Sequence, residues 1–234
     1  MFILGTICCR GGSQGVQEKN IRLVCGKPLL AYTVDEALKC SLLNDVIVST
    51  DSPAIKKTAT DAGIKYIIHR PAELATDTIS KWPVFIHAVE SYQQEKKISV
   101  DYIVDMDVTV PLKTKDDIEA AIKTAIANPM ADVVITGYEP ERNPYFNMME
   151  MDANGFAHIV KQTTKPVVRR QDAPPVFSLT PAAYVIKKEA LYKYEHWSLA
   201  QCIVHLIPRE RAVDIDTEND LQFVEFLMSA NGRK

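Results

Sequence analysis

The chain has 234 residues, of which 47% are hydrophobic and 24% charged, and this composition excludes collagen-like, disordered and coiled-coil proteins. Its net charge of -3 disfavours a nucleic-acid-binding protein, because such domains usually carry a basic excess. The apolar stretch at 2–9 is too short for a membrane span and lacks the basic segment of a signal peptide. Five cysteines without a CxxC pair indicate a reducing, cytoplasmic setting.

The first part of the chain alternates buried strands with helices. Apolar runs predict strands at about 2–9, 45–50, 65–68, 101–106 and 131–136. Apolar periodicity, capping residues and prolines at helix starts predict helices at about 28–40, 53–62, 80–95 and 114–127. Strands separated by helices of this length are typical of an α/β fold with a mostly parallel sheet and helices on both faces.

The rhythm changes between 137 and 180, which is rich in proline and contains the hairpin signal Asn154-Gly155. We expect an inserted antiparallel arm within a single domain that spans 1–234. The aromatic residues and methionines of the arm favour a partner surface and therefore a homodimer, whereas a lid over its own subunit is the alternative. The α/β rhythm returns with strands at 182–186 and 204–207 and a helix at about 218–230.

The strongest local signal is the loop Arg10-Gly-Gly-Ser-Gln-Gly, which follows the first strand and leads to Lys19-Asn20. Open α/β sheets bind ligands at the carboxyl ends of their strands, and glycines let several N–H groups approach one anion. Arg10 and Lys19 add positive charge. The Walker and dinucleotide patterns are both absent. The loop predicts a phosphate cradle, with a merely tight turn as the alternative.

An acidic pair, Asp105 and Asp107, lies at the end of the strand expected at 101–106. The two residues share a face because side chains alternate along a strand. Carboxylates that point the same way repel each other unless a cation or proton lies between them, and Mg²⁺ prefers one or two carboxylates plus substrate oxygens. The pair predicts a divalent cation site. The alternative is that one aspartate caps the next loop and the other is solvated.

A second acidic pair, Asp214 and Asp216, stands just before the last helix. Thr217 and Asp220 resemble a capping box, and Asp216 could also serve as a cap. Capping is therefore the better interpretation for at least one of the pair. A metal role would require them to lie near the 105–107 pair in space.

These residues together resemble the acylneuraminate cytidylyltransferases, also called CMP-sialic acid synthetases. The resemblance runs in order through 10–15, 19–22, 26–33, 49–51, 70–80, 109–112, 170–172 and 214–221. It implies a three-layer, Rossmann-like nucleotidyltransferase fold with a dimerisation arm. It also implies an enzyme of polysaccharide biosynthesis that joins CTP to a nonulosonic (sialic-acid-like) sugar with Mg²⁺, giving the CMP-sugar and pyrophosphate.

The resemblance assigns roles to individual residues. The nucleotide set is Arg10, Gly11, Gly12, Ser13, Lys19, Asn20, Arg70 and Ser80. The sugar set is Asp107, Thr109, Arg170 and Tyr184, with Arg170 reaching over from a partner subunit. The metal set is Asp214, Asp216 and Asp107. Arg10, Lys19 and Asp107 are the expected catalytic residues.

The chain also departs from the family pattern. Gln14 stands where the family usually has lysine, Asp107 where it has glutamine, and Thr180-Pro181 where asparagine and glycine are common. The changes on the sugar side favour a relative of sialic acid, such as legionaminic or pseudaminic acid. Two alternatives stay open: a nucleotidyltransferase of the same fold acting on another sugar or alcohol phosphate, and a non-catalytic nucleotide- or sugar-binding regulator.

Overall fold

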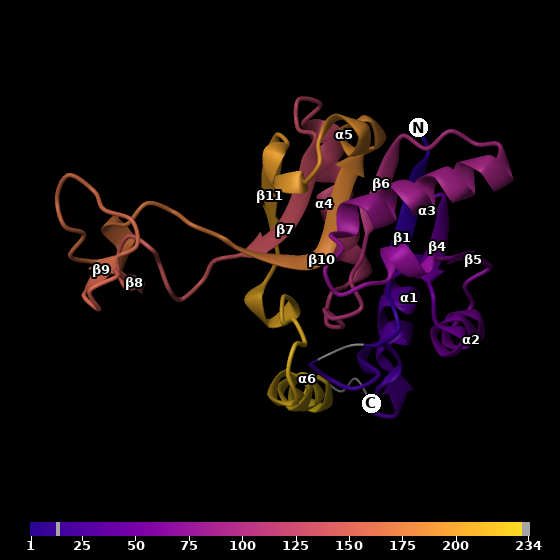
Figure 1. The fold of residues 1–234 in the computed structure, drawn as a ribbon, viewed down its shortest axis with the longest axis horizontal. Helices are drawn as coiled ribbons and strands as arrows, with labels where there is room; N and C mark the ends of the chain where they lie inside the picture. Colours follow the sequence, from indigo (N-terminus) through magenta and orange to yellow (C-terminus); the bar gives the residue numbers. More distant parts are fainter. Residues whose placement is uncertain (13–14, 231–234) are drawn as a thin grey trace. The chain divides into compact units, whose positions relative to one another are not determined.

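The computed structural model describes residues 1–12 and 15–230, and a seven-stranded sheet forms the centre of its larger part (Figure 1). The strand order is β11-β7-β10-β6-β1-β4-β5. The strands are β1 (Ile3–Cys8), β4 (Asp45–Thr50), β5 (Tyr66–His69), β6 (Tyr102–Asp105), β7 (Val133–Tyr138), β10 (Ser178–Lys187) and β11 (Cys202–Leu206). Neighbouring strands run parallel in the pairs β1–β4, β1–β6, β4–β5 and β7–β11, whereas β10 is antiparallel to β6.

Helices cover both faces of this sheet and make it a three-layer α/β fold. One face packs against α1 (Leu29–Lys39), α2 (Pro53–Asp61), α4 (Lys115–Ala127) and α6 (Glu218–Ala230). The other face packs against α3 (Lys81–Lys96), which crosses the strands in Figure 1, and α5 (Lys188–Lys193). Each face has its own apolar core because successive side chains of a strand point to opposite sides. In β1, for example, Ile3 belongs to one core and Leu4 to the other.

Local capping explains where the helices begin. The Ser52 side chain accepts a hydrogen bond from the Ile55 N–H at the start of α2, where Pro53 occupies the first turn. Thr114 and Asp117 form a reciprocal capping box at the start of α4. Such caps satisfy N–H groups that have no partner inside the helix. The predicted start signals at 53 and 114 are therefore confirmed.

Shorter elements connect these layers. The structure has the 3₁₀ helices η1 (Lys19–Ile21), η2 (Ala72–Leu74), η3 (Arg170–Asp172), η4 (Trp197–Leu199) and η5 (Arg209–Arg211). A two-residue hairpin pairs β2 (Leu23–Val24) with β3 (Lys27–Pro28). None of the described helices is long and apolar enough to cross a membrane.

The segment Tyr138–Ser178 forms a compact unit of its own, and residues 1–137 and 179–234 form the other. Within the smaller unit, β8 (Met149–Met151) pairs antiparallel with β9 (Ala157–Ile159). Gly155 has a φ of 84° in the connection, a conformation that glycine adopts without strain. The hairpin signal at 154–155 is thus confirmed.

Candidate active site

The glycine loop and the 105–107 pair follow two neighbouring strands of the sheet. β1 and β6 pair in parallel with Thr6 opposite Asp105, so their carboxyl ends meet at one edge. The chain leaves β1 for β4 on one side, while β6 lies on the other side. Strand order therefore reverses between β1 and β6, and crevices at such a switch point are where open α/β sheets bind ligands.

The described part of the glycine loop is bonded to neighbouring residues. The Asn20 side-chain amide donates to the Arg10 carbonyl at 2.9 Å, and the Gly11 N–H donates to an Asp51 carboxylate oxygen at 2.9 Å. Gly12 has a φ of 70°, with no atom within 4 Å of where a Cβ would stand. Ser13 and Gln14 lie outside the described residues. The described part of the loop thus has open space at Gly12 and one backbone N–H, that of Gly11, bound to an anionic oxygen.

Lys19 connects the glycine loop to the 214–216 segment. Its ammonium donates to the Ile215 carbonyl at 2.6 Å and lies 3.3 Å from an Asp216 carboxylate oxygen. At Gly15 a Cβ would collide with the Asp216 carbonyl oxygen, so only glycine permits this approach. The structure thus brings the glycine loop and the 214–216 segment together.

Arg10 forms an ion pair with Asp77. Both side chains are partly exposed, and partly exposed pairs contribute only about 0–1 kcal/mol to stability. A polyphosphate can therefore draw the guanidinium away from Asp77 at little cost.

Arg70 and Ser80 are further members of the nucleotide set, and Arg70 is engaged by the protein itself. The Arg70 guanidinium is 4% exposed and donates to the Ser49 carbonyl at 2.9 Å. Its Nε also lies 3.4 Å from the Ser49 hydroxyl oxygen. Ser80 is the N-cap residue of α3, without a side-chain capping bond.

The two carboxylates of the 105–107 pair point the same way, as predicted, and the cation between them is an ammonium. Lys81 Nζ lies 3.2 Å from Asp105 Oδ2 and also contacts Asp107 Oδ2. Asp105 is fully buried, and its other oxygen accepts a hydrogen bond from the Thr6 hydroxyl at 3.0 Å. The other oxygen of Asp107 accepts the Thr109 N–H at 3.2 Å. A metal ion bound to this pair would have to displace Lys81.

This pairing determines the charge states of Asp107 and Lys81. Burial disfavours the charged carboxylate of Asp107, but the Lys81 ammonium, together with the Thr109 N–H and Lys113, outweighs burial and lowers the pKa of Asp107 to about 2. Burial likewise disfavours the Lys81 ammonium, but Asp105 and Asp107 outweigh it and raise the pKa of Lys81. Both groups are therefore charged at neutral pH. With a pKa this low, Asp107 suits an ion-pairing or hydrogen-bond-accepting role better than that of a general base.

Asp214 has the environment expected of a cation ligand. Its Oδ1 is buried without a hydrogen-bond partner among the described residues. Burial raises the pKa of this carboxyl, and the charges of Asp107 and Asp216 add to the effect. The adjacent Ile215 N–H donates to the Thr109 carbonyl at 2.9 Å, which holds this segment beside the end of β6. An orphaned buried carboxylate oxygen next to other carboxylates fits a divalent cation.

Asp216 is available for the same role because other residues cap α6. Thr217 and Asp220 form the reciprocal pair of a capping box, with Asp220 N–H to Thr217 Oγ1 at 3.3 Å and Thr217 N–H to Asp220 Oδ2 at 2.8 Å. No group of three or more His, Cys, Asp or Glu side chains placed to hold a metal ion occurs among the described residues. Two carboxylates that leave most positions to water and phosphate oxygens agree with the preference of Mg²⁺.

Two members of the sugar set lie in different compact units. Tyr184 stands opposite Asp105 in the β10–β6 ladder and is half-buried. Burial raises its pKa, and the charges of Lys81, Asp105 and Asp107 also act on it, so its ring lies by the acidic pair. Arg170 begins η3 in the Tyr138–Ser178 unit and is exposed there.

Sequence reasoning missed two lysines of this site. Lys81 begins α3, where the helix dipole disfavours a cation, and this unfavourable placement is the signal that could have identified it. Lys113 is fully buried and donates to the Thr33 hydroxyl at 2.8 Å, the Asp107 carbonyl at 2.5 Å and the Val110 carbonyl at 2.8 Å. Burial lowers the pKa of Lys113 to about 7. Its bonds brace the turn that carries Asp107.

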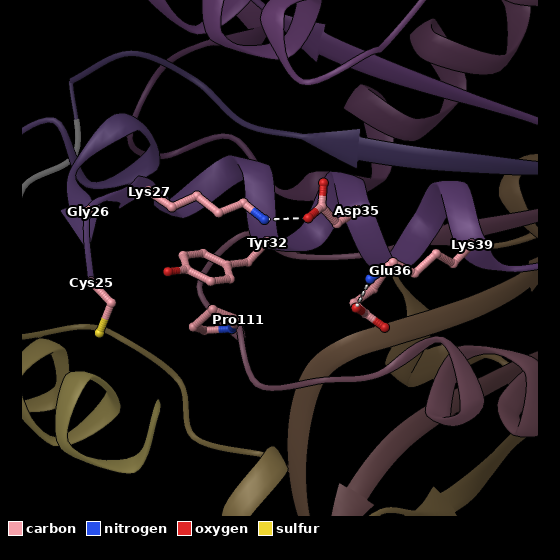
Figure 2. Close-up of a pocket in the computed structure, with 8 residues that line it drawn as sticks. All are labelled: Cys25, Gly26, Lys27, Tyr32, Asp35, Glu36, Lys39 and Pro111. Atoms are coloured by element: carbon pink, nitrogen blue, oxygen red, sulfur yellow. Dashed lines mark hydrogen bonds and ion pairs between the residues drawn. The ribbon is translucent and has the colours of Figure 1, made fainter. Parts of the chain in front are cut away.

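A separate cavity of about 410 Å³ lies beside α1 and the β2–β3 hairpin (Figure 2). Its lysines are engaged with neighbouring carboxylates, Lys27 with Asp35 and Lys39 with Glu36. None of the residues that line it belongs to the nucleotide, sugar or metal sets. Its charges are therefore paired within the wall of the cavity.

Comparison with known proteins places this geometry in a family. The cytidylyltransferase family model matches residues 4–227. Post-translational flagellin modification protein B of Campylobacter coli is 33% identical over 97% of this chain and 94% of its own length. CMP-N,N'-diacetyllegionaminic acid synthase of Campylobacter jejuni is 33% identical over 97% of this chain and 95% of its own.

A solved structure extends the comparison to the fold. A CMP:2-keto-3-deoxy-manno-octonic acid synthetase complexed with CTP superposes with a TM-score of 0.70. It covers 99% of this chain and 100% of its own at 17% identity, which shows a shared fold. The nucleotidyltransferase fold expected from the sequence is thus confirmed. The chain belongs to the cytidylyltransferase family and is a CTP-dependent nucleotidyltransferase.

Proposed function

We propose that this enzyme joins CTP to a nonulosonic acid and releases pyrophosphate, with a divalent cation held by Asp214 and Asp216. The observation that carries the proposal is the joining of the glycine loop to the 214–216 segment through Lys19 at the β1–β6 switch point. This arrangement supports a phosphate-binding loop that lies next to a cation site. The similarity to a legionaminic acid synthase along almost the whole chain supports an acidic nine-carbon sugar as the acceptor.

The reaction would be an in-line displacement at phosphorus. The anomeric hydroxyl oxygen of the sugar forms a bond to the α-phosphorus of CTP, and the bond from that phosphorus to the bridging oxygen breaks. Pyrophosphate leaves with the bridging oxygen, and the hydroxyl proton passes to water. Such a reaction depends on positioning and on stabilising charge more than on covalent help from the protein.

Different residues would stabilise the phosphates and position the sugar. Arg10, released from Asp77, and Lys19 would hold the β- and γ-phosphates as they leave. A divalent cation on Asp214 and Asp216 would supply charge for the α-phosphate. On the sugar side, Asp107 and Tyr184 would position the hydroxyl groups.

The arm would complete the enzyme as a homodimer. The Tyr138–Ser178 unit exposes a group of apolar side chains, Met148, Met149, Met151, Phe156 and Val168. Exposed apolar groups of this kind are typical of protein interfaces. We propose that they pack against a second copy, which would bring Arg170 of the partner subunit to the sugar carboxylate.

The test is pyrophosphate release with CTP and Mg²⁺ against a panel of acidic sugars. The panel contains N,N'-diacetyllegionaminic acid first, then pseudaminic acid, N-acetylneuraminic acid and the eight-carbon Kdo. Release with a nine-carbon acid, and no release with UTP in place of CTP, is the expected result. Release with Kdo alone, or no release across the panel while CTP still binds in calorimetry, would contradict the proposed acceptor.

A further inference from the structure

The two acidic pairs of the site differ in one respect: a single lysine contacts both carboxylates of the 105–107 pair, whereas in the other pair Lys19 lies 3.3 Å from a carboxylate oxygen of Asp216. Lys81 Nζ lies between the Oδ2 atoms of Asp105 and Asp107, at 3.2 Å from the first and in contact with the second. The remaining oxygen of Asp105 accepts the Thr6 hydroxyl, and that of Asp107 accepts the Thr109 N–H. By contrast, Asp214 Oδ1 is buried without a partner among the described residues.

Two carboxylates on one face of a strand end need a cation between them, especially where one is fully buried. A divalent cation would fill that place by binding both oxygens at about 2.0–2.6 Å. The Lys81 ammonium already occupies it and uses its N–H donors on the same two oxygens. The metal and the ammonium therefore compete for one position.

The lysine has two advantages in this competition. It is part of the chain, starting at the first residue of α3, so binding it costs no translational freedom. Lys113 also bonds to the Asp107 carbonyl from within the core, and this bond fixes the turn that carries Asp107 where Lys81 reaches it. These contacts within the chain thus disfavour the binding of a divalent metal ion between Asp105 and Asp107.

We propose that Lys81 is a built-in cation that takes the place of a divalent metal ion between Asp105 and Asp107. It leaves the 214–216 segment as the position for the catalytic ion. Lys81 is then a positioning residue, which keeps Asp107 oriented on the sugar side of the site. This inference rests on the proposed function only for the role of that ion in the reaction.

The test counts Mn²⁺ bound per chain by electron paramagnetic resonance, with the full-length protein and without nucleotide. Lys81→Met removes the ammonium but keeps much of the side-chain volume, and it should gain one bound Mn²⁺ per chain over the wild type. The gain should disappear in the double variant Lys81→Met with Asp107→Asn. Lys81→Arg, which keeps a cation, should keep the wild-type count.

A matched control is Lys188→Met, which removes another lysine, one whose ammonium lies 3.3 Å from the Ser99 hydroxyl oxygen. It should also keep the wild-type count. An unchanged Mn²⁺ count in folded Lys81→Met would overturn the proposal, as would a gain in Lys81→Arg.

A second variant keeps the test decisive if Lys81→Met does not fold. Asp107→Asn in the otherwise unchanged chain should leave the Mn²⁺ count and affinity as they are, because Asp107 binds no metal. A loss of Mn²⁺ binding in this variant would overturn the proposal. None of these readouts needs turnover, so failure of the pyrophosphate assay and failure of this inference are distinguishable.

Discussion

At the scale of single residues, Lys19 carries the connection between phosphate binding and the acidic segment. Its side chain is 13% exposed, and its ammonium contacts both the Ile215 carbonyl and the Asp216 carboxylate. The Lys19 ammonium is thus next to both the segment proposed to bind the divalent cation and the loop that would hold the phosphates. Position, more than the formal charge, makes this lysine different from the others on the surface.

We predict that Lys19→Met lowers the rate of pyrophosphate release by about 10²–10³-fold, the range for losing one preorganised donor to developing charge. The matched control is Arg22→Met, which removes a nearby cation that pairs with Glu218, 3.8 Å away on α6. Initial rates at saturating CTP are the measurement, with thermal unfolding to compare stability. Equal losses in both variants would show that the effect is general electrostatics and would reject the role of Lys19.

The sequence predicted the general chemistry of the 105–107 pair but not the ion. It predicted a divalent cation between two carboxylates on one face, whereas the structure has the Lys81 ammonium there. Its identity depends on how α3 packs across the sheet, and no local pattern contains that information. Lys81 lies 24 residues before Asp105, and only the tertiary fold brings them together.

At the scale of elements, the residues that cap the start of α6 differ from the acidic residues proposed to bind the cation. Sequence reasoning expected at least one of Asp214 and Asp216 to be a cap, and this expectation is wrong: Thr217 and Asp220 form the capping box instead. The Asp216 carboxylate faces Lys19. The Thr217–Asp220 capping box was visible in the sequence. Whether Asp214 or Asp216 would also cap the helix depended on the rotamers of neighbouring side chains.

We predict that Thr217→Ala destabilises the protein by about 1 kcal/mol, because it removes the side-chain acceptor of the Asp220 N–H in the first turn of α6. Asp216→Ala should lose divalent cation binding with little change in stability, since its side chain caps nothing. Chemical denaturation and Mn²⁺ binding of both variants are the measurements. If Asp216→Ala were the more destabilised of the two, the assignment of the cap would be wrong.

At the scale of the whole molecule, most of the fold followed from the alternation of strands and helices. The strand at 45–50 and the helix at 218–230 agree with the sequence expectation to the residue. The differences concern long-range pairing. β10 runs from Ser178 to Lys187, well beyond the expected 182–186, and it is antiparallel to β6. Apolar runs predict a buried strand but not its direction, because direction depends on the path of the arm before it.

The oligomeric state is the remaining prediction at this scale. We predict that the protein is a homodimer in light scattering at working concentration, and that Met151→Lys shifts it toward the monomer. Met151 is 77% exposed in the Tyr138–Ser178 unit, and a charge placed in an apolar interface is costly because it must be desolvated. Loss of the dimer should also remove activity if the partner subunit's Arg170 contributes to the sugar site.

Met130 provides the matched control for this variant. It is 86% exposed but belongs to the other compact unit, so Met130→Lys adds the same charge outside the arm. This variant should remain dimeric and active, because an exposed side chain outside an interface stays solvated. A monomeric wild type, or equal dissociation of both variants, would reject the arm as the dimer contact. The sugar carboxylate would then need a cation from within the same chain.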